Sequence, residues 1–455
     1  MHADALSTEA RALARIAGPV VIAELGWMSM GLVDTVMVGP LGPEAIAAVG
    51  LGSGVFTAIA VFGMGLLLGL DTLVSQAFGA KRRDECRLWL RHGIGLALLA
   101  APPILVISAL VTWSLDAWQL NPDILALTRP YLTLINLSTV PLLLYAALRR
   151  YLLGIHHTPP IMFALVSANV VNAVANYVFV YGHAGMPALG VTGSALATTL
   201  ARVYMAIVLW VAVRRVNRGA PVITPRGLDA GRLGRLVRLG LPAALQVTLE
   251  VGAFTVATAL AARLDAVSSA SHQIAMNIAS FAYMVPLGLC SAAAVRVGHA
   301  IGARDLRRAV RAGWTAIVLS CLLMACVGLL LWLAPRPLLV PFSTDAAVIA
   351  LGSRLLFIAA AFQLFDAVQT VAIGALRGVG DTFAPMLIGL VGHWLVGLPT
   401  GYVLCFVLGR GVLGLWMGFL AGLVVVAAVL LAVWRARGIR LLASPEATAL
   451  AVSPT

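Results

Sequence analysis

Apolar stretches long enough to cross a membrane recur along the whole chain of 455 residues. A helix needs about 20 apolar residues to cross the ~30 Å hydrocarbon core of a bilayer. Hydrophobic residues make up 61% of the chain and charged residues only 11%, whereas a soluble domain carries about 25% charged residues. We therefore predict an all-α integral membrane protein with twelve transmembrane helices. The predicted spans are 16–38, 46–78, 93–113, 129–148, 160–181, 189–213, 240–260, 268–295, 312–334, 354–375, 384–408 and 411–434.

The first of these stretches, 16–38, is expected to be a retained span. It is too long for the core of a signal peptide, and no small-residue cleavage site follows it.

The two halves of the chain align with each other at an offset of about 223 residues. Residues 74–80, VSQAFGA, align with residues 297–303, VGHAIGA, and each segment is followed by a basic run. Gly18-Pro19 likewise aligns with Leu241-Pro242. Each half holds six spans, an even number, so both halves enter the membrane from the same side and form a parallel repeat.

This repeat predicts two six-helix lobes, with a functional site between them and one lobe rocking against the other. The predicted N-terminal lobe is 1–213 and the C-terminal lobe is 239–440. Residues 214–238 are the predicted cytoplasmic linker, in which leucines among arginines suggest a short helix on the membrane surface. Residues 441–455 are predicted to form a disordered cytoplasmic tail.

Positive charge is concentrated on one side of the predicted membrane. With both termini in the cytoplasm, 25 of the 31 Lys and Arg fall in cytoplasmic segments, including Arg149, Arg150 and five arginines within 296–311. This predicts a multi-pass protein of a bacterial cytoplasmic (inner) membrane and accounts for the net charge of +13. Because the basic residues are divided among many short loops, we expect no nucleic-acid partner, but we expect contact with anionic lipid headgroups.

Five acidic residues fall inside the predicted spans: Glu24, Asp34, Asp71, Glu250 and Asp366. An ionisable group at membrane depth is costly and usually marks a substrate or ion pathway. Two interpretations remain open for each acid. It either takes part in transport, or it makes a structural hydrogen bond or a buried pair with Arg202, the one base inside a span.

Asp366 has the most informative surroundings. Phe362, Gln363, Gln369 and Thr370 lie three or four residues from it, on the same face of a helix. A carboxylate with amides, a hydroxyl and an aromatic ring suits an organic cation, although a polar seam between helices has the same composition.

Two further acids are candidates for binding the coupling ion. Glu250, with Gln246 one turn before it, lies in the same half as Asp366. Carboxylates on two helices can share a monovalent cation, either sodium or a proton. Asp34 is near the end of the first span in GLVDTVMVGPLG, where it either takes an ion or caps a helix beside Gly39-Pro40. No metal is expected beyond a possible sodium ion at Glu250 and Asp366.

Amide side chains recur at helical spacing in two other spans. Gln273 and Asn277 share one face of the eighth span, and Asn172 and Asn176 share one face of the fifth. We predict that such residues line the substrate cavity. The predicted cavity residues are Gln273, Asn277, Phe362, Gln363, Gln369, Asn172, Asn176 and Gln246.

Several of these segments together carry a family resemblance. The chain resembles the multidrug and toxic compound extrusion (MATE) transporters, specifically their NorM branch, over nearly its whole length and in order. The matching segments are GLVDTVMVGPLG, DTLVSQAFGA, ALQVTLEVGAF, ASHQIAMNIASFAYMVPLGLCSAAAVRVGHAIGA, FDAVQTVAIGALRGVGDTFAPM, GHWLVGLPTGYVL and GVLGLWMGFLAGL.

The resemblance implies a secondary antiporter with the MATE fold that exports organic cations by a rocking alternating-access cycle driven by inward sodium or proton movement. It assigns cation coupling to Glu250 and Asp366, and also implicates Asp34. Asn172 matches an asparagine of a first-lobe ion site in related members. Asn176 stands where some of them have aspartate, which favours a site in the second lobe. Phe362 stands where a tyrosine is expected, so one hydroxyl ligand is missing.

From these patterns we expect no catalytic activity and no cofactor, and we expect the protein to be a monomer. Three rival functions differ in what they require. A lipid-precursor flippase needs arginines for phosphate groups in its cavity, whereas the intramembrane charges here are mainly acidic. A membrane enzyme needs clustered catalytic residues, which we do not find. A passive channel is disfavoured by the paired acids and the repeat, although the sequence alone leaves it open.

Overall fold

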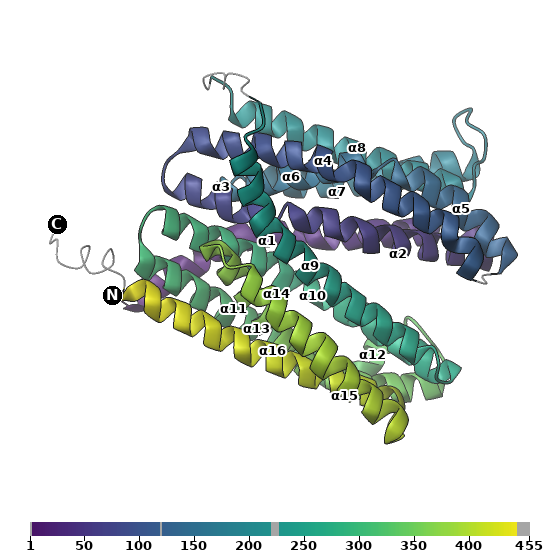
Figure 1. Cartoon of the computed structure of the whole chain (residues 1–455). Coiled ribbons are helices and arrows are strands. Elements are labelled where there is room, and N and C mark those ends of the chain that lie inside the picture. Colours follow the sequence, from purple (N-terminus) through teal and green to yellow (C-terminus); the bar gives the residue numbers. More distant parts are fainter. Residues whose placement is uncertain (1, 119–120, 220–226, 444–455) are drawn as a thin grey trace. The chain divides into compact units, whose positions relative to one another are not determined.

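The computed structural model describes residues 2–118, 121–219 and 227–443, and their regular structure is helical (Figure 1). Eleven of the described helical segments are long and apolar enough to cross a membrane, and one further pair of helices forms a bent span. The all-α membrane fold and the prediction of twelve spans are thereby confirmed.

Eight helices form the first six spans. They are α1 (His2–Val38), α2 (Pro43–Leu66) with α3 (Gly69–Gly79), α4 (Arg83–Ser114), α5 (Pro122–Asn136) with α6 (Thr139–Gly154), α7 (Pro159–Tyr181) and α8 (Val191–Val216). Short 3₁₀ turns, η1 (Gly39–Leu41) and η2 (Leu115–Trp118), follow α1 and α4.

The last six spans repeat this plan. They are α9 (Ala230–Ala261), α10 (Ala266–Gly302), α11 (Leu306–Leu333), α13 (Ala346–Val379), the composite segment Phe383–Val407 and α16 (Gly411–Leu442), with the short α12 (Pro335–Leu339) before α13. The composite segment contains α14 (Phe383–Leu390), the π turn η3 (Val391–Gly397), α15 (Leu398–Tyr402) and a second π turn, η4 (Val403–Val407).

The bent span has a local cause in the sequence. Helices α5 and α6 meet at Leu137 and Ser138 with an angle of 47°. Pro141 follows four residues after Leu137. A proline has no N–H to donate, and its ring collides with the carbonyl group four residues earlier, so a regular helix cannot continue through this point.

Helix α16 packs tightly on the composite segment through small residues. Gly418 lies so close to Gly401 that a Cβ atom on Gly418 would collide with the Gly401 backbone. Gly422 approaches the backbone of Gly392 and Gly397 in the same way. Repeated small residues four positions apart are a common way for membrane helices to come into backbone contact.

The chain forms two compact units. The N-unit comprises 22–74 and 82–244, and the C-unit comprises the described residues of 1–21, 75–81 and 245–455. Thus the start of α1 and the end of α3 belong to the C-unit, whereas the start of α9 belongs to the N-unit. The lobes 1–213 and 239–440 stay a prediction about the bodies that move in transport.

The sequence repeat reappears in the packing of each unit. In the N-unit a Cβ atom on Gly65 would collide with Ala244, and in the C-unit one on Gly288 would collide with Val21. Gly65 and Gly288 are repeat equivalents at the offset of about 223 residues, and so are Val21 and Ala244. Equivalent glycines therefore admit equivalent helices at close range.

Many of the arginines that we assigned to cytoplasmic loops lie inside helices, and three of these are buried. Arg149 is in α6, Arg296 in α10 and Arg377 in α13, and all three are buried. The helices extend beyond their apolar stretches, and buried partners hold these side chains. The count of loop charges was too high for this reason.

The predicted linker and tail are described only in part. Residues 220–226 and 444–455 lie outside the described residues. Leu233, Leu236 and Val237 lie in the first turns of the continuous helix α9, so the prediction of a separate surface helix is wrong for these residues. Within the predicted tail, α16 continues to Leu442.

Candidate functional site

The Asp34 carboxylate is the centre of a buried polar cluster in the N-unit. Asn172 and Asn176 of α7 donate to its Oδ1 through their Nδ2 atoms, at 3.0 and 2.8 Å. Thr198 of α8 donates to its Oδ2 through Oγ1, at 2.6 Å. All four side chains are buried. Because α7 presents its asparagines one turn apart, both amides reach the same carboxylate oxygen.

This cluster has the composition of a site for a monovalent cation. The side-chain Oδ1 atoms of Asn172 and Asn176 are buried and accept no hydrogen bond. Together with the Asp34 carboxylate and the Thr198 hydroxyl, they supply the oxygen ligands that hard cations prefer. Asp34 lies inside α1, which continues to Val38, so the alternative that it caps a helix beside Gly39-Pro40 is wrong.

The Glu250 carboxylate of α9 is the centre of a second polar cluster, in the C-unit. Gln246, one turn earlier, donates to its Oε2 at 2.8 Å. Gln369 of α13 donates to its Oε1 at 2.9 Å. Gln369 has a buried Oε1 atom without a hydrogen-bond partner. As in the N-unit, a carboxylate accepts hydrogen bonds from two amides.

Asp366 belongs to the same cluster. It is buried on α13 one turn before Gln369, and its carboxylate interacts electrostatically with that of Glu250. The structure thus brings together the two acids of the C-terminal half.

Tyr283 of α10 is a member of this cluster that we did not predict. Its phenol interacts electrostatically with Glu250 and Asp366. It supplies a hydroxyl near the acids, whereas the sequence suggested that a hydroxyl was missing at Phe362. Tyr283 is out of register with the i, i+4 pair Gln273 and Asn277, so the polar periodicity did not reveal it.

Four other predicted cavity residues lie in two different environments. Phe362 is buried in the C-unit core, with its ring 6.2 Å from Phe254 and 5.9 Å from Trp416. Gln363 is buried and donates to the Ala279 carbonyl at 3.1 Å. Gln273 and Asn277 are exposed on α10. Phe362 and Gln363 therefore pack helices together, and only Gln273 and Asn277 present open amides.

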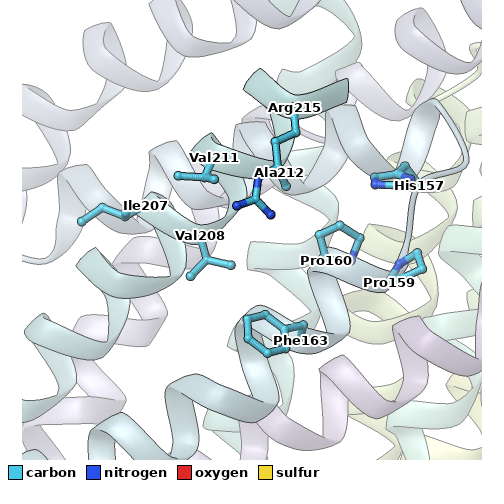
Figure 2. A pocket seen from close by; sticks show the side chains of 9 residues that line it. All are labelled: His157, Pro159, Pro160, Phe163, Ile207, Val208, Val211, Ala212 and Arg215. Carbon is cyan, nitrogen blue, oxygen red and sulfur yellow. The ribbon is translucent and has the colours of Figure 1, made fainter. Parts of the chain in front are cut away.

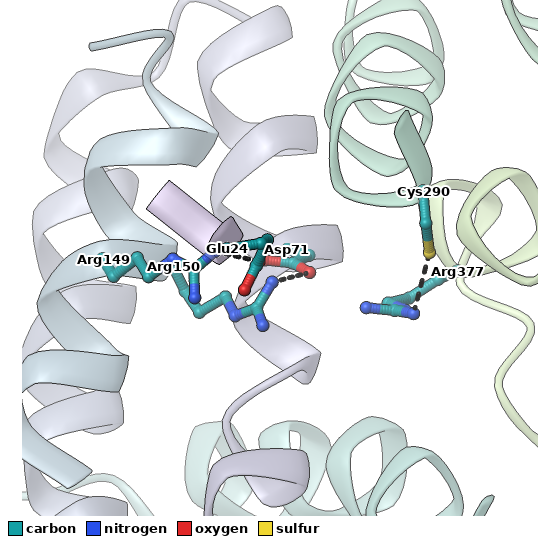
Figure 3. Close-up of polar contacts among 6 residues, drawn as sticks. All are labelled: Glu24, Asp71, Arg149, Arg150, Cys290 and Arg377. Carbon is teal, nitrogen blue, oxygen red and sulfur yellow. Dashed lines mark hydrogen bonds and ion pairs between the residues drawn. The ribbon is translucent and has the colours of Figure 1, made fainter. Parts of the chain in front are cut away.

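The remaining intramembrane acids are paired with arginines. In the N-unit, Glu24 bonds Arg149, and Asp71 pairs with Arg150 at 3.1 Å (Figure 3). In the C-unit, Glu9 accepts two bonds of 2.8 Å from Arg296. The structural interpretation therefore fits Glu24 and Asp71.

Two further arginines, Arg202 and Arg377, also lie inside the spans. Arg202 donates to Ser138 at 2.5 Å, and its guanidinium lies over Phe56 at 4.5 Å from the ring centroid. Arg202 forms no direct ion pair with an acid among the described residues, but it interacts electrostatically with Asp34. Arg377 donates to the Cys290 sulfur at 3.4 Å (Figure 3).

Among the described residues, no group of three or more His, Cys, Asp or Glu is arranged to hold a metal ion. The candidate cation sites at Asp34 and Glu250 use amides and hydroxyls instead, which bind monovalent ions more weakly than a multi-carboxylate cage binds divalent ones.

Comparison with known proteins places this architecture among membrane transporters. A family model described as MatE matches residues 19–178 and again residues 242–403. The two matches start about 223 residues apart, in agreement with the repeat. The chain is 37% identical over 443 residues to the probable multidrug resistance protein NorM of Mesorhizobium japonicum, covering 94% of each chain. It is also 37% identical over 436 residues to the multidrug resistance protein NorM of Burkholderia vietnamiensis, again covering 94% of each.

Solved structures show the same fold at lower identity. The eukaryotic MATE transporter AtDTX14 has a TM-score of 0.86 and 21% identity, with 96% of this chain and 99% of that chain covered. An outward-facing multidrug resistance MATE family transporter has a TM-score of 0.88 and 20% identity, with 96% and 97% covered.

Proposed function

This chain belongs to the MatE (multidrug and toxic compound extrusion) family, and from that premise we propose that it is a secondary active antiporter that exports organic cations. Inward movement of sodium or protons drives the export, through an alternating-access cycle in which one lobe rocks against the other. Its proposed substrates are small organic cations, and two relatives are named multidrug resistance proteins.

The pairing of the buried acids carries this proposal. Glu24 and Asp71 each have an arginine partner, whereas Asp34, Glu250 and Asp366 have no ion-pair partner among the described residues. A carboxylate buried without a counter-charge is costly. The free-energy cost of burying the carboxylate falls when a proton or a cation binds to it. Asp366 and the partly buried Glu250 have no cation among their described electrostatic partners, and Asp34 interacts with Arg202 without a direct bond. These three carboxylates supply sites that an ion and a cationic drug can occupy in turn.

In the proposed cycle, a cationic drug is taken up from the cytoplasm near Asp366, Gln369, Gln273 and Asn277. After the lobes rock, a sodium ion or proton enters from outside, binds Glu250 and Asp366, and displaces the drug. Asp34 with Asn172, Asn176 and Thr198 forms a second ion site. One charge moving inward gains about 2.3 kcal/mol per 100 mV, so an ion gradient must add to the potential for strong accumulation.

The proposed location follows from the charge pattern. The protein is a multi-pass membrane protein, and we place it in a bacterial cytoplasmic membrane with both termini inside, as a monomer.

The experiment that tests this function is efflux of a fluorescent organic cation from proteoliposomes. A sodium gradient and a pH gradient are imposed separately on wild-type protein and on Asp366→Asn. We expect efflux with one gradient and its loss in Asp366→Asn, because the neutral amide cannot exchange an ion for a drug.

The matched control is Asp381→Asn, which removes an acid that pairs with Arg437 and is remote in sequence from the cluster. Its efflux should remain within about twofold of wild type, because Asp381 is not a member of the acid cluster and the amide oxygen of the variant can still accept from the Ala384 N–H. Unchanged efflux in Asp366→Asn, or efflux that needs neither gradient, would contradict the proposal.

A further inference from the structure

We propose that a groove between the inner halves of α7 and α8, in the N-unit, binds a phospholipid with an anionic headgroup. The groove has a volume of about 520 Å³ (Figure 2). It is lined by His157, Pro159, Pro160, Phe163, Ile207, Val208, Val211, Ala212 and Arg215.

The groove follows from the antiparallel packing of the two helices. On α8 the lining positions Val208, Val211, Ala212 and Arg215 recur every three or four residues, so they form one continuous face. Small or short side chains, such as Ala212 opposite Pro160, leave the space between the helices unfilled.

One end of the groove carries polar groups, and a polar contact joins the two helices beyond the other end. His157 and Arg215 lie at one end, and Figure 2 shows the Arg215 guanidinium turned in among the lining residues. Farther along the same helix pair, Tyr204 of α8 donates to Ser167 of α7 at 3.1 Å and joins the two helices. From Arg215 to Tyr204 the helix rises about 16 Å, which is about the depth of one leaflet of hydrocarbon.

The lining matches a lipid in polarity as well as in length. Its middle is apolar and open to the surroundings, since the side chains of Phe163 and Ile207 are 60% and 56% exposed. Its polar end carries one arginine and one histidine and no acid, and no carboxylate pairs with Arg215 among the described residues. The Arg215 guanidinium lies beside an apolar groove and has no carboxylate partner in the described part of the chain. A ligand that joins an anionic group to an acyl chain fits both features.

The depth of the charged end favours a lipid of the inner leaflet. Arg214, Arg215 and Arg218 lie at the end of α8 that the charge pattern predicts to be cytoplasmic. Anionic phospholipids attract basic groups at that surface by about 1 kcal/mol for each Lys or Arg. The phosphate would sit at Arg215 and His157, and one acyl chain would lie along Phe163 and Val208.

The test compares lipid binding by native mass spectrometry of the full-length protein in detergent. Dioleoyl phosphatidylglycerol and dioleoyl phosphatidylcholine are titrated against wild type, Arg215→Gln and Arg214→Gln. Arg214 is the matched control, because it lies over the Trp210 ring at 5.1 Å and does not line the groove. We expect wild type and Arg214→Gln to prefer phosphatidylglycerol, and Arg215→Gln to bind it about fivefold more weakly.

Two more variants keep the test decisive. Arg215→Lys retains the charge and should retain the preference, and Ala212→Phe fills the channel and should remove tight binding of both lipids. Equal binding of the two lipids by wild type, or equal losses in Arg215→Gln and Arg214→Gln, would overturn the proposal. Full displacement of phosphatidylglycerol by inorganic phosphate would also overturn the proposal, because the site would then recognise a phosphate group without an acyl chain.

Discussion

At the scale of single residues, the buried acids divide into two groups by their partners. Glu24 and Asp71 are neutralised by arginines of α6. Asp34 and Glu250 are held by amides and a hydroxyl and form no direct ion pair among the described residues. The first group stabilises the fold at the cost of burying charge, and the second group is the one that we propose to exchange an ion for a drug. Substitutions should therefore separate stability from transport.

Replacing Arg149 by Met should destabilise the protein by about 3 kcal/mol, because it leaves Glu24 buried without its partner. Thermal unfolding of the purified protein measures this loss. The double variant Glu24→Gln/Arg149→Met should recover most of the stability, since neither charge then remains. A double variant that is less stable than Arg149→Met alone would show that the two residues do not act as a pair.

Replacing Asp34 by Asn should have the opposite profile. The new amide oxygen can still accept from Asn172 and Asn176, and the Thr198 hydroxyl, which then faces the amide nitrogen, can accept from it instead of donating. A buried charge also disappears, so thermal stability should stay near the wild-type level. Gradient-driven efflux should fall at least tenfold if the Asp34 site carries the ion. A variant that unfolds as readily as Arg149→Met would assign Asp34 a structural role instead.

The sequence revealed which residues are buried and polar, but it did not reveal their partners. Hydropathy places Glu24 and Asp34 at membrane depth, whereas the rotation of each helix about its axis decides whether an arginine or an amide meets them. Tyr283 was missed for the same reason. It interacts with Glu250 and Asp366, which lie on other helices, and the spacing of polar residues along α10 does not predict such a contact.

At the scale of elements, close helix contacts depend on glycines. Gly418→Leu should prevent α16 from packing on α15, because the approach to Gly401 leaves no room even for a Cβ atom. We expect loss of the monodisperse folded protein in size-exclusion chromatography.

The matched control for this substitution is Gly50→Leu. Gly50 is also inside a helix, but a Cβ atom there meets nothing within 4 Å. Its elution should match wild type. If both variants elute normally, close packing at Gly418 is not required for the fold.

The helices were more predictable than their irregularities. The existence of each span follows from its apolar length, and the break before α6 can be explained by Pro141. The π turns η3 and η4 could not be predicted from the sequence, because they depend on how the composite segment packs on the glycines of α16.

At the scale of the whole molecule, the repeat describes the scaffold and not the sites. Gly65 and Gly288 are equivalent and play equivalent packing roles. Asp34, by contrast, corresponds to Ala257 at the same offset, and Glu250 corresponds to Trp27. The two halves therefore keep a common helix packing, while the candidate cation sites lie at positions that the repeat does not relate.

The most direct test of the central claim, that the unpaired acids exchange a cation or proton for the drug, measures ion release on drug binding. The purified protein in weakly buffered detergent receives a cationic drug, and a pH indicator follows released protons while bound radioactive sodium is counted in parallel. The account predicts that wild type releases one of the two ions and that Glu250→Gln and Asp366→Asn release less. Drug binding without release of either ion, or full release by both variants, would contradict it.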